Sequence, residues 1–264
     1  MIRKVSLVLC VVFMQLACAQ EKEIVVIIPS YNNEAWYEKN LDSVVAQQYS
    51  NWRAIYINDC SNDNTGDVVA HYINNKHMAD KITLINNVER KGALYNIYTA
   101  IEQCPDNAVI ITLDGDDWFA HDGVLARVNQ EYSTTDAWLT YGAYQEYPGG
   151  GIGGGRQVPE EIINNNAIRR APWYTTHLRT FYAWLFKRIN KEDLMYDGKF
   201  FEVTWDQAFM FPMVEMAAQH AHHIPEVLYI YNQATPLNDF KVRLRLQLQM
   251  EKVIRSKERY SPIE

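Results

Sequence analysis

Three carboxylates stand within four positions of one another in the segment Ile-Ile-Thr-Leu-Asp-Gly-Asp-Asp-Trp at 110–118. Asp114, Asp116 and Asp117 follow directly on an apolar, β-type run, and carboxylates this close repel each other unless a cation compensates them. Oxygen ligands suit a hard divalent ion, which in proteins often serves a phosphate. The spacing therefore predicts a metal site at a strand tip. The alternative is an acidic turn in which Asp117 or His121 starts the next helix.

The composition limits the classes of function. With 264 residues, 48% of them hydrophobic, the chain can form one sizeable α/β core, or one core with an appended subdomain. The formal net charge of −7 argues against nucleic acid as a partner, because a nucleic-acid binder is expected to show a basic surface. An anionic substrate would need a local site with its own cation.

The first 19 residues predict a secretory signal peptide. Two basic residues precede an apolar run at 5–16, and the small residues at 17–19 form an A-x-A-like cleavage site. The run is shorter than the roughly 20 residues of a membrane span. An uncleaved signal anchor and lipid attachment at Cys18 are the alternatives, so membrane association through the N-terminus stays open. The expected location is a secretory-pathway lumen or an exported, periplasmic state.

Cysteine usage predicts no disulfide framework. Beyond the leader the chain keeps only Cys60 and Cys104; two free thiols are the expected state, with a single bridge as the alternative. No C-x-x-C motif and no His/Cys spacing indicates a zinc site.

Apolar strands alternate with helical patterns from residue 23 to residue 141, which predicts a parallel sheet built from βαβ units. The expected strands are 24–28, 52–57, 81–85, 108–113 and 137–141, and the expected helices are 34–48, 65–75, 92–103 and 123–131. Short polar loops at 30–33, 58–61 and 114–117 follow three of these strands. Ligands of an open parallel sheet bind outside the carboxyl ends of its strands. We therefore expect these three loops to converge on one crevice.

The pattern changes after residue 141. The glycine-rich segment 148–155 contains a formal G-x-G-x-x-G, but no βαβ unit opens there, so it predicts a hairpin tip or a mobile loop over the site. A helical pattern around 205–216 and a strand at 227–231 follow. A tail helix from about residue 239 to 259 is expected to pack on the core, with a membrane-surface role as the lesser alternative.

Three motifs, in this order and spacing, resemble the family 2 glycosyltransferases with the GT-A fold. They are Ile-Ile-Pro-Ser-Tyr-Asn at 27–32, Tyr-Ile-Asn-Asp-Cys-Ser-Asn-Asp at 56–63 and Leu-Asp-Gly-Asp-Asp at 113–117. The resemblance covers roughly residues 23–125 and continues loosely at 204–207. It implies an α/β GT-A fold: a Rossmann-like, mostly parallel sheet flanked by helices, with a C-terminal acceptor-side region. Residues 20–145 would form the nucleotide-sugar half, 146–238 the acceptor and catalytic-base half, and 239–264 a C-terminal helix or tail.

The resemblance implies transfer of a sugar from a nucleotide-sugar, usually with inversion at the anomeric carbon. By position, Tyr31 and Glu34 would line the nucleotide pocket. Asp59 would accept a hydrogen bond from the base, a task that suits an acceptor-only carboxylate facing a uracil N–H, so a UDP-sugar is the expected donor. A turn or cap is the alternative for Asp59. Lys91, at a helix start, would meet the diphosphate, or belong to a solvated surface pair with Arg90.

The resemblance also implies a Mn²⁺ or Mg²⁺ cofactor at the acidic turn. Asp116 would coordinate the metal, with Asp114 as a second ligand or as support for the ribose or a water on the metal. The ion would offset the charge of the leaving nucleoside diphosphate. For Asp117 the alternative is a cap of the next helix.

An inverting transfer needs a base for the acceptor hydroxyl, and Asp206 has the matching position. The family motif is usually Glu-Asp, whereas this chain has Trp205-Asp206. The alternative is an ordinary residue of a first helical turn that interacts with the helix dipole.

Histidines receive less weight. The spacing of His220, His222 and His223 does not place all three on one helical face, so two surface histidines and one packed histidine are expected. The segment 177–180, His-Leu-Arg-Thr, precedes an expected aromatic helix and either shapes the acceptor pocket or packs.

Two other functions compete with a glycosyltransferase. A nucleotidyltransferase acting on sugar phosphates usually has a glycine-rich loop after its first strand, but residues 30–34 contain no glycine. A catalytically silent GT-A carbohydrate-binding protein is disfavoured by the intact Asp59, Asp116 and Asp206. Neither the donor sugar (hexose or N-acetylhexosamine) nor the acceptor is specified. A glycan, a protein or a lipid-linked saccharide stays open as acceptor.

Overall fold

The computed structural model describes residues 21–235 and 242–264. The predicted leader, and the first residues of the predicted tail helix, lie outside the described residues. Among the helices that are described, none combines the length and the apolar character needed to span a bilayer.

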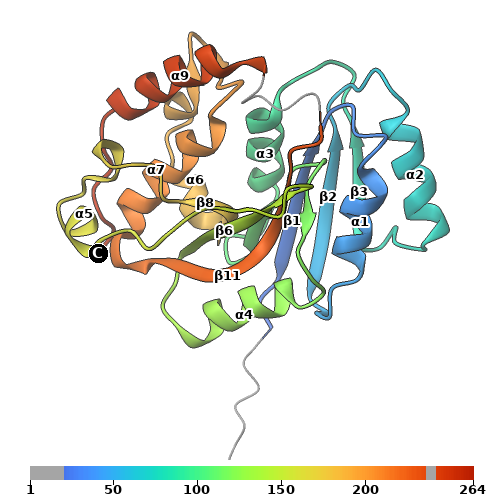
Figure 1. The fold of residues 1–264 in the computed structure, drawn as a ribbon, viewed down its shortest axis with the longest axis horizontal. Coiled ribbons are helices and arrows are strands. Elements are labelled where there is room, and N and C mark those ends of the chain that lie inside the picture. The colour runs from blue at the N-terminus through green and yellow to red at the C-terminus, as the bar shows by residue number, and fades with distance from the viewer. Residues whose placement is uncertain (1–20, 236–241) are drawn as a thin grey trace, which may run out of the picture.

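The described residues form one mixed, nine-stranded sheet in the order β3-β2-β1-β4-β8-β6-β11-β5, with β7 beside β6 (Figure 1). Strands β1 to β4 are parallel, whereas β8 is antiparallel to both β4 and β6, and β11 is parallel to β6. The strands are β1 (Ile24–Ser30), β2 (Trp52–Asn58), β3 (Ile82–Asn86), β4 (Val109–Thr112), β5 (Trp118–Phe119), β6 (Leu139–Tyr147), β7 (Ile152–Gly154), β8 (Thr176–Tyr182) and β11 (Ala221–Asn232), with a separate hairpin of β9 (Met195–Tyr196) and β10 (Lys199–Phe200).

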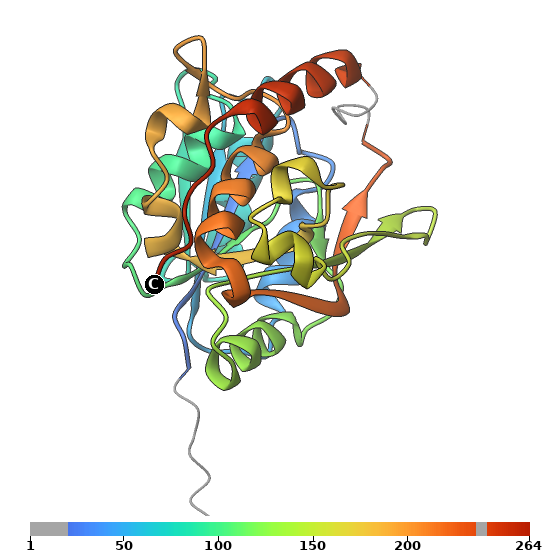
Figure 2. The same ribbon diagram turned by 90° about the vertical axis from the view of Figure 1, so that its left-hand side faces the viewer.

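Helices cover both faces of the sheet. Alternate residues of β1 point to opposite sides, so Val25 and Ile27 join one core cluster while Val26 and Ile28 join the other. The first cluster contains α3, α6, α7 and α9, and the second contains α1, α2 and α4. Figure 2 shows α9, in red, running across the end of α7, in orange. The helices are α1 (Tyr37–Val45), α2 (Thr65–Asn75), α3 (Ala93–Glu102), α4 (Val124–Thr134), α5 (Glu160–Asn164), α6 (Ala183–Lys187), α7 (Trp205–Ala217) and α9 (Leu244–Ser256).

The predicted elements of the first half are present, with shifted ends. Helix α1 begins at Tyr37, later than predicted, because residues 34–36 form a turn in which the N–H groups of Trp36 and Tyr37 both donate to the Asn33 carbonyl. The predicted hairpin at the glycine-rich segment is confirmed: β6 runs on to Tyr147 and pairs with β7. Helix α9 packs as expected and buries Met250 and Ile254. Within the described residues, both cysteines, Cys60 and Cys104, are free, as predicted.

The histidine cluster was assigned to the wrong kind of element. Strand β11 begins at Ala221, six residues earlier than predicted, because it pairs with β6 from Leu139 onward. His222 and His223 therefore lie on a strand, and an argument from helical faces does not apply to them. The segment 177–180 likewise belongs to β8.

Candidate functional site

A cleft of about 1370 Å³ opens where β1, β2 and β4 end. It brings together residues from all three loops that were expected to meet there, among them Tyr31, Asp59 and Asp116. The opposite wall comes from the second half of the chain. Its lining includes Tyr144, His177, Arg179, Thr204, Trp205, Asp206, Gln207 and six residues near or in α9.

The acidic turn is packed tightly against the end of β1. The Gly115 N–H donates to the Pro29 carbonyl at 3.1 Å. A Cβ on Gly115 would approach Ser30 Oγ to 2.6 Å and Asn33 Nδ2 to 2.7 Å, so only glycine fits without displacement. From the other side, the buried Asn40 amide donates to the carbonyls of residues 114 and 117 at 3.0 and 2.7 Å. The backbone of the turn is therefore fixed.

Asp117 is a buried anchor of this turn. Its carboxylate accepts hydrogen bonds from the Tyr229 hydroxyl (2.5 Å) and the Asn232 N–H (2.7 Å), both on β11. Burial, followed by the charges of Asp116 and Asp114, raises the pKa of Asp117 well above its ordinary value. The alternative that Asp117 or His121 starts a helix is wrong, because α4 begins at Val124 without a side-chain cap.

Asp114 and Asp116 are partly exposed and line the cleft. Both contribute negative charge at Asp117, which shows how closely the three carboxyls lie. Hard oxygen ligands of this kind fit Mg²⁺ or Mn²⁺, which proteins typically hold through one or two carboxylates together with substrate phosphates and water. In the described part of the chain, no three His, Cys, Asp or Glu side chains are placed to hold a metal by themselves. The turn thus fits a metal that a phosphate ligand completes.

Asp59 follows β2 at the cleft floor and is 4% exposed. It accepts hydrogen bonds from Asn87 Nδ2 (2.8 Å), the Lys91 N–H (2.9 Å) and the Gly92 N–H (2.8 Å). Burial works against ionisation of this carboxyl, but the hydrogen bonds outweigh burial, and its pKa lies below the ordinary value. Asp59 is therefore an ionised carboxylate that also fixes the loop before α3.

The other predicted nucleotide contacts divide into two groups. Tyr31 and Lys91 line the cleft: the Arg90 guanidinium stacks 3.8 Å from the Tyr31 ring centroid, and the Lys91 ammonium pairs with Glu89. Glu34 is not among the lining residues. Its carboxylate accepts hydrogen bonds from the backbone and side chain of Asn64, at the start of α2.

Asp206 lies in the first turn of α7, on the wall opposite Asp59. Thr204, which precedes the helix, has a left-handed backbone (φ +56°) that turns the chain into α7. Asp206 Oδ1 accepts the Gln207 N–H at 3.0 Å, and Oδ2 accepts an N–H from Arg179 at 2.9 Å. Its side chain is 23% exposed and is accessible from the cleft.

Several residues that support the site were not assigned a role in it from the sequence. Asn40, Tyr229 and Asn232 hold the acidic turn, and His177 and Arg179 stand behind Asp206. The signal for the last two was present, since segment 177–180 was a candidate for the acceptor pocket. No sequence signal marked the other three, Asn40, Tyr229 and Asn232, because a buried Tyr or Asn belongs to no recognisable local spacing.

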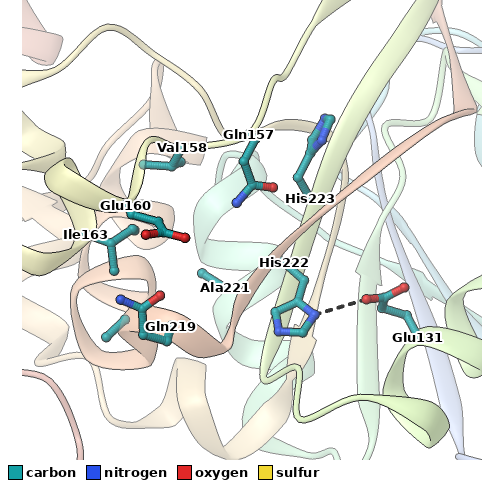
Figure 3. A pocket seen from close by; sticks show the side chains of 10 residues that line it. Glu131, Gln157, Val158, Glu160, Ile163, Gln219, Ala221, His222 and His223 are labelled. Carbon is teal, nitrogen blue, oxygen red and sulfur yellow. Dashed lines mark hydrogen bonds and ion pairs between the residues drawn. The ribbon is translucent and has the colours of Figure 1, made fainter.

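A second, smaller hollow of about 270 Å³ lies near the start of β11 (Figure 3). His222 and Glu131 line it, and His222 Nδ1 pairs with Glu131 at 3.0 Å. Outside the lining, Asp136 lies 3.3 Å from His222 Nε2, and His220 stacks on Trp138 with ring centroids 4.1 Å apart. His222 is thus engaged on both ring nitrogens within the protein.

A protein-family model for glycosyl transferase family 2 matches residues 25–194. The chain belongs to this family. This confirms the resemblance found in the three motifs, and the family match includes every cleft residue up to Arg179 but ends before Asp206.

Curated glycosyltransferases are similar to this chain over parts of their length. The glycosyltransferase GlyA of Streptococcus pneumoniae is 27% identical over 80% of this chain and 30% of the relative. The Escherichia coli WfgD, a UDP-Glc:α-D-GlcNAc-diphosphoundecaprenol β-1,3-glucosyltransferase, is 27% identical over 54% of each chain. The chain therefore spans about a third and about half of these two relatives.

Solved structures confirm the GT-A fold. Staphylococcus aureus TarS in complex with UDP-GlcNAc superposes with a TM-score of 0.63 at 14% identity, over 88% of this chain and 66% of that chain. The mannosyltransferase PcManGT of Pyrobaculum calidifontis, in complex with GDP-Man and Mn²⁺, gives 0.60 at 19% identity, over 90% and 66%. At these identities the likeness concerns the fold.

Proposed function

We propose that this protein is a divalent-metal-dependent glycosyltransferase that transfers a sugar from a UDP-sugar to a hydroxyl acceptor with inversion. One observation carries the proposal: a single cleft is lined by Asp59, by Asp114 and Asp116, and, on its opposite wall, by Asp206. These carboxylates would recognise the base, bind the metal that holds the phosphates and deprotonate the acceptor around one ligand-sized space.

The nucleotide would bind at the Asp59 side of the cleft. The lowered pKa of Asp59 keeps it an acceptor at neutral pH, as recognition of a uracil N–H requires. The Arg90 guanidinium over Tyr31 makes a flat cationic surface beside it. Lys91 would compensate diphosphate charge at the start of α3.

Asp114 and Asp116 would hold Mn²⁺ or Mg²⁺. When bound, the ion supplies Lewis-acid stabilisation of the departing diphosphate. Asn40 and Gly115 keep the turn in one conformation, so that the two carboxylates need not reorganise to bind it.

Asp206 would act as the general base. It would take the proton of the acceptor hydroxyl as the acceptor oxygen bonds to the anomeric carbon and the bond from that carbon to the phosphate oxygen breaks, releasing UDP. A direct displacement of this kind needs only one base and inverts the anomeric centre. Asp206 is partly exposed at the start of α7, so an acceptor can reach one edge of its carboxylate.

The donor would carry a hexosyl or an N-acetylhexosaminyl group, and a glycan, a protein or a lipid-linked saccharide would serve as acceptor. WfgD, by its name, uses a diphosphoundecaprenol-linked acceptor. We further propose that the N-terminal leader sends the protein into a secretory lumen or out of the cytosol, with membrane association through the N-terminus. Cell fractionation of the full chain against a variant lacking residues 1–19 tests this.

A panel of UDP-glucose, UDP-GlcNAc, UDP-galactose and GDP-mannose, each with Mn²⁺ and with EDTA, tests the proposed activity. We expect Mn²⁺-dependent release of UDP and free sugar from at least one donor, and loss of turnover in Asp206→Asn. Release of pyrophosphate from a nucleoside triphosphate and a sugar phosphate would instead establish a nucleotidyltransferase. Metal-dependent UDP binding without turnover would indicate a silent carbohydrate-binding protein.

A further inference from the structure

Arg179 on β8 joins two side chains of the cleft wall. One of its terminal nitrogens donates to Asp206 Oδ2 at 2.9 Å and also lies 3.1 Å from His177 Nε2. His177 can accept this hydrogen bond because burial, followed by the charge of Arg179, lowers its pKa well below 6.5 and keeps it neutral. The same guanidinium nitrogen is therefore held by His177 and contacts the proposed base.

Exposure separates the roles of the two ion-pair partners. The Arg179 side chain is 4% exposed, whereas that of Asp206 is 23% exposed. A ligand in the cleft would meet the carboxylate, with the guanidinium mainly behind it. Arg179 is thus suited to orient Asp206.

His177 connects this pair to the acidic turn. Its ring stacks on Tyr229, with centroids 4.2 Å apart and planes 22° from parallel. The hydroxyl of Tyr229 in turn donates to the buried Asp117 carboxylate. Through these contacts, the position of Asp206 is linked to that of the turn that carries Asp114 and Asp116.

A purely structural ion pair in the same protein has a different appearance. Arg169 binds both oxygens of Glu215, at 2.6 and 2.8 Å, and a third nitrogen donates to the Ile254 carbonyl at 2.8 Å. By contrast, Arg179 Nε and His177 Nδ1 are buried and have no hydrogen-bond partner within residues 21–235 and 242–264. Buried polar groups without partners weaken a fold, so packing alone does not explain Arg179.

We propose that Arg179, itself held by His177, is a positioning residue. It holds the Asp206 carboxylate toward the acceptor side of the cleft and at a fixed position relative to the acidic turn. This inference rests on the proposed function of Asp206 as the base. A base displaced by about 1 Å can lose on the order of 100-fold in rate, so the guanidinium would act on kcat and leave nucleotide binding intact.

The test compares Arg179→Lys with the matched control Arg169→Lys, because both variants keep the charge and lose the planar fork. For each variant, kcat for hydrolysis of UDP-glucose and UDP-GlcNAc, the Kd of UDP with Mn²⁺, and the Tm are measured. We expect Arg179→Lys to lower kcat about 10- to 100-fold, with UDP affinity within about twofold of wild type. Arg169→Lys should lower Tm but leave kcat per folded molecule unchanged.

A double-mutant cycle adds a readout that a structural role would not change. If Arg179 acts through Asp206, Arg179→Lys should have little further effect on single-turnover hydrolysis in an Asp206→Asn background. An unchanged kcat in Arg179→Lys, a loss of UDP affinity as large as the loss of kcat, or additive effects in the cycle would overturn the inference. Absence of wild-type turnover with every donor would instead overturn the proposed function itself.

Discussion

The Tyr229 hydroxyl donates a 2.5 Å hydrogen bond to Asp117 Oδ2, across 112 positions of the chain. This bond attaches the acidic turn after β4 to the last strand of the second half. Together with the 2.7 Å hydrogen bond from the Asn232 N–H to the other oxygen, it gives each oxygen of the buried Asp117 carboxylate a partner. Asp114 and Asp116, by contrast, line the cleft.

Asp206→Asn should lower kcat for sugar transfer or donor hydrolysis by about 10²- to 10⁴-fold, the usual contribution of a general base. The amide keeps the shape of the side chain but cannot take the acceptor proton. Isothermal titration with UDP and Mn²⁺ should give wild-type affinity, since Asp206 lies on the wall opposite Asp59. Retained turnover in this variant would assign the base elsewhere.

Asp116→Asn should weaken Mn²⁺-dependent binding of UDP by at least about tenfold, because even partners outside the first coordination shell contribute about 10- to 100-fold to metal affinity. In the wild type, EDTA should remove the gain in UDP affinity that Mn²⁺ provides. Asp80→Asn, which changes an exposed carboxylate between α2 and β3, is the control for net charge. Equal losses in both variants would argue against a metal at the turn.

Gly115→Ala should destabilise the fold by about 1–3 kcal/mol, the usual range for overpacking. The added Cβ would lie within 2.6 to 2.7 Å of Ser30 and Asn33 side-chain atoms. Because the turn must shift to relieve this contact, UDP affinity with Mn²⁺ should fall as well. Urea denaturation measures the first effect, and Gly149→Ala, where a Cβ meets nothing within 4 Å, should match the wild type.

His177 should make unfolding sensitive to acid. Its pKa in the folded protein is well below the ordinary 6.5 because of burial, and then because of Arg179. Between those two values the unfolded chain binds a proton that the folded protein does not, so its contribution to stability is lost as pH falls below about 6.5, with a slope of up to about 1.4 kcal/mol per pH unit.

Urea denaturation at pH 7 and pH 5 tests this contribution. The free energy of unfolding of His177→Phe should fall less steeply toward pH 5 than that of the wild type. His71→Gln, at an exposed position on α2, should keep the wild-type slope. Parallel slopes in wild type and His177→Phe would contradict the assignment of a neutral, buried His177.

Much of the first half of the fold could be predicted from local sequence patterns. The alternation of apolar runs with helical periods predicted β1 to β4, and α2 was predicted at its observed bounds, Thr65–Asn75. Strand ends in a parallel sheet share one edge, so the meeting of the three polar loops could be anticipated before any contact was known. Glu34, by contrast, was predicted from its position in the motif and lies outside the cleft lining, because Asn64 at the start of α2 binds its carboxylate.

The second half was harder to predict because its strands are antiparallel or join the sheet out of sequence order. β11 pairs with β6, and its early start at Ala221 depends on that distant partner. The mistaken helical interpretation of the histidine cluster has the same origin. Spacing alone cannot tell a strand edge from a helix end when the pairing partner lies about 80 residues away.

The sequence by itself determined the family, the order of strands and helices around the first three motifs, and which residues carry carboxylates at strand tips, since apolar period and turn chemistry are local properties. Only the tertiary structure decided that Asp117 is buried against Tyr229 while Asp116 faces the cleft, and that Arg179 stands behind Asp206. Those outcomes depend on which distant segments exclude water from a side chain. No short stretch of sequence records that burial.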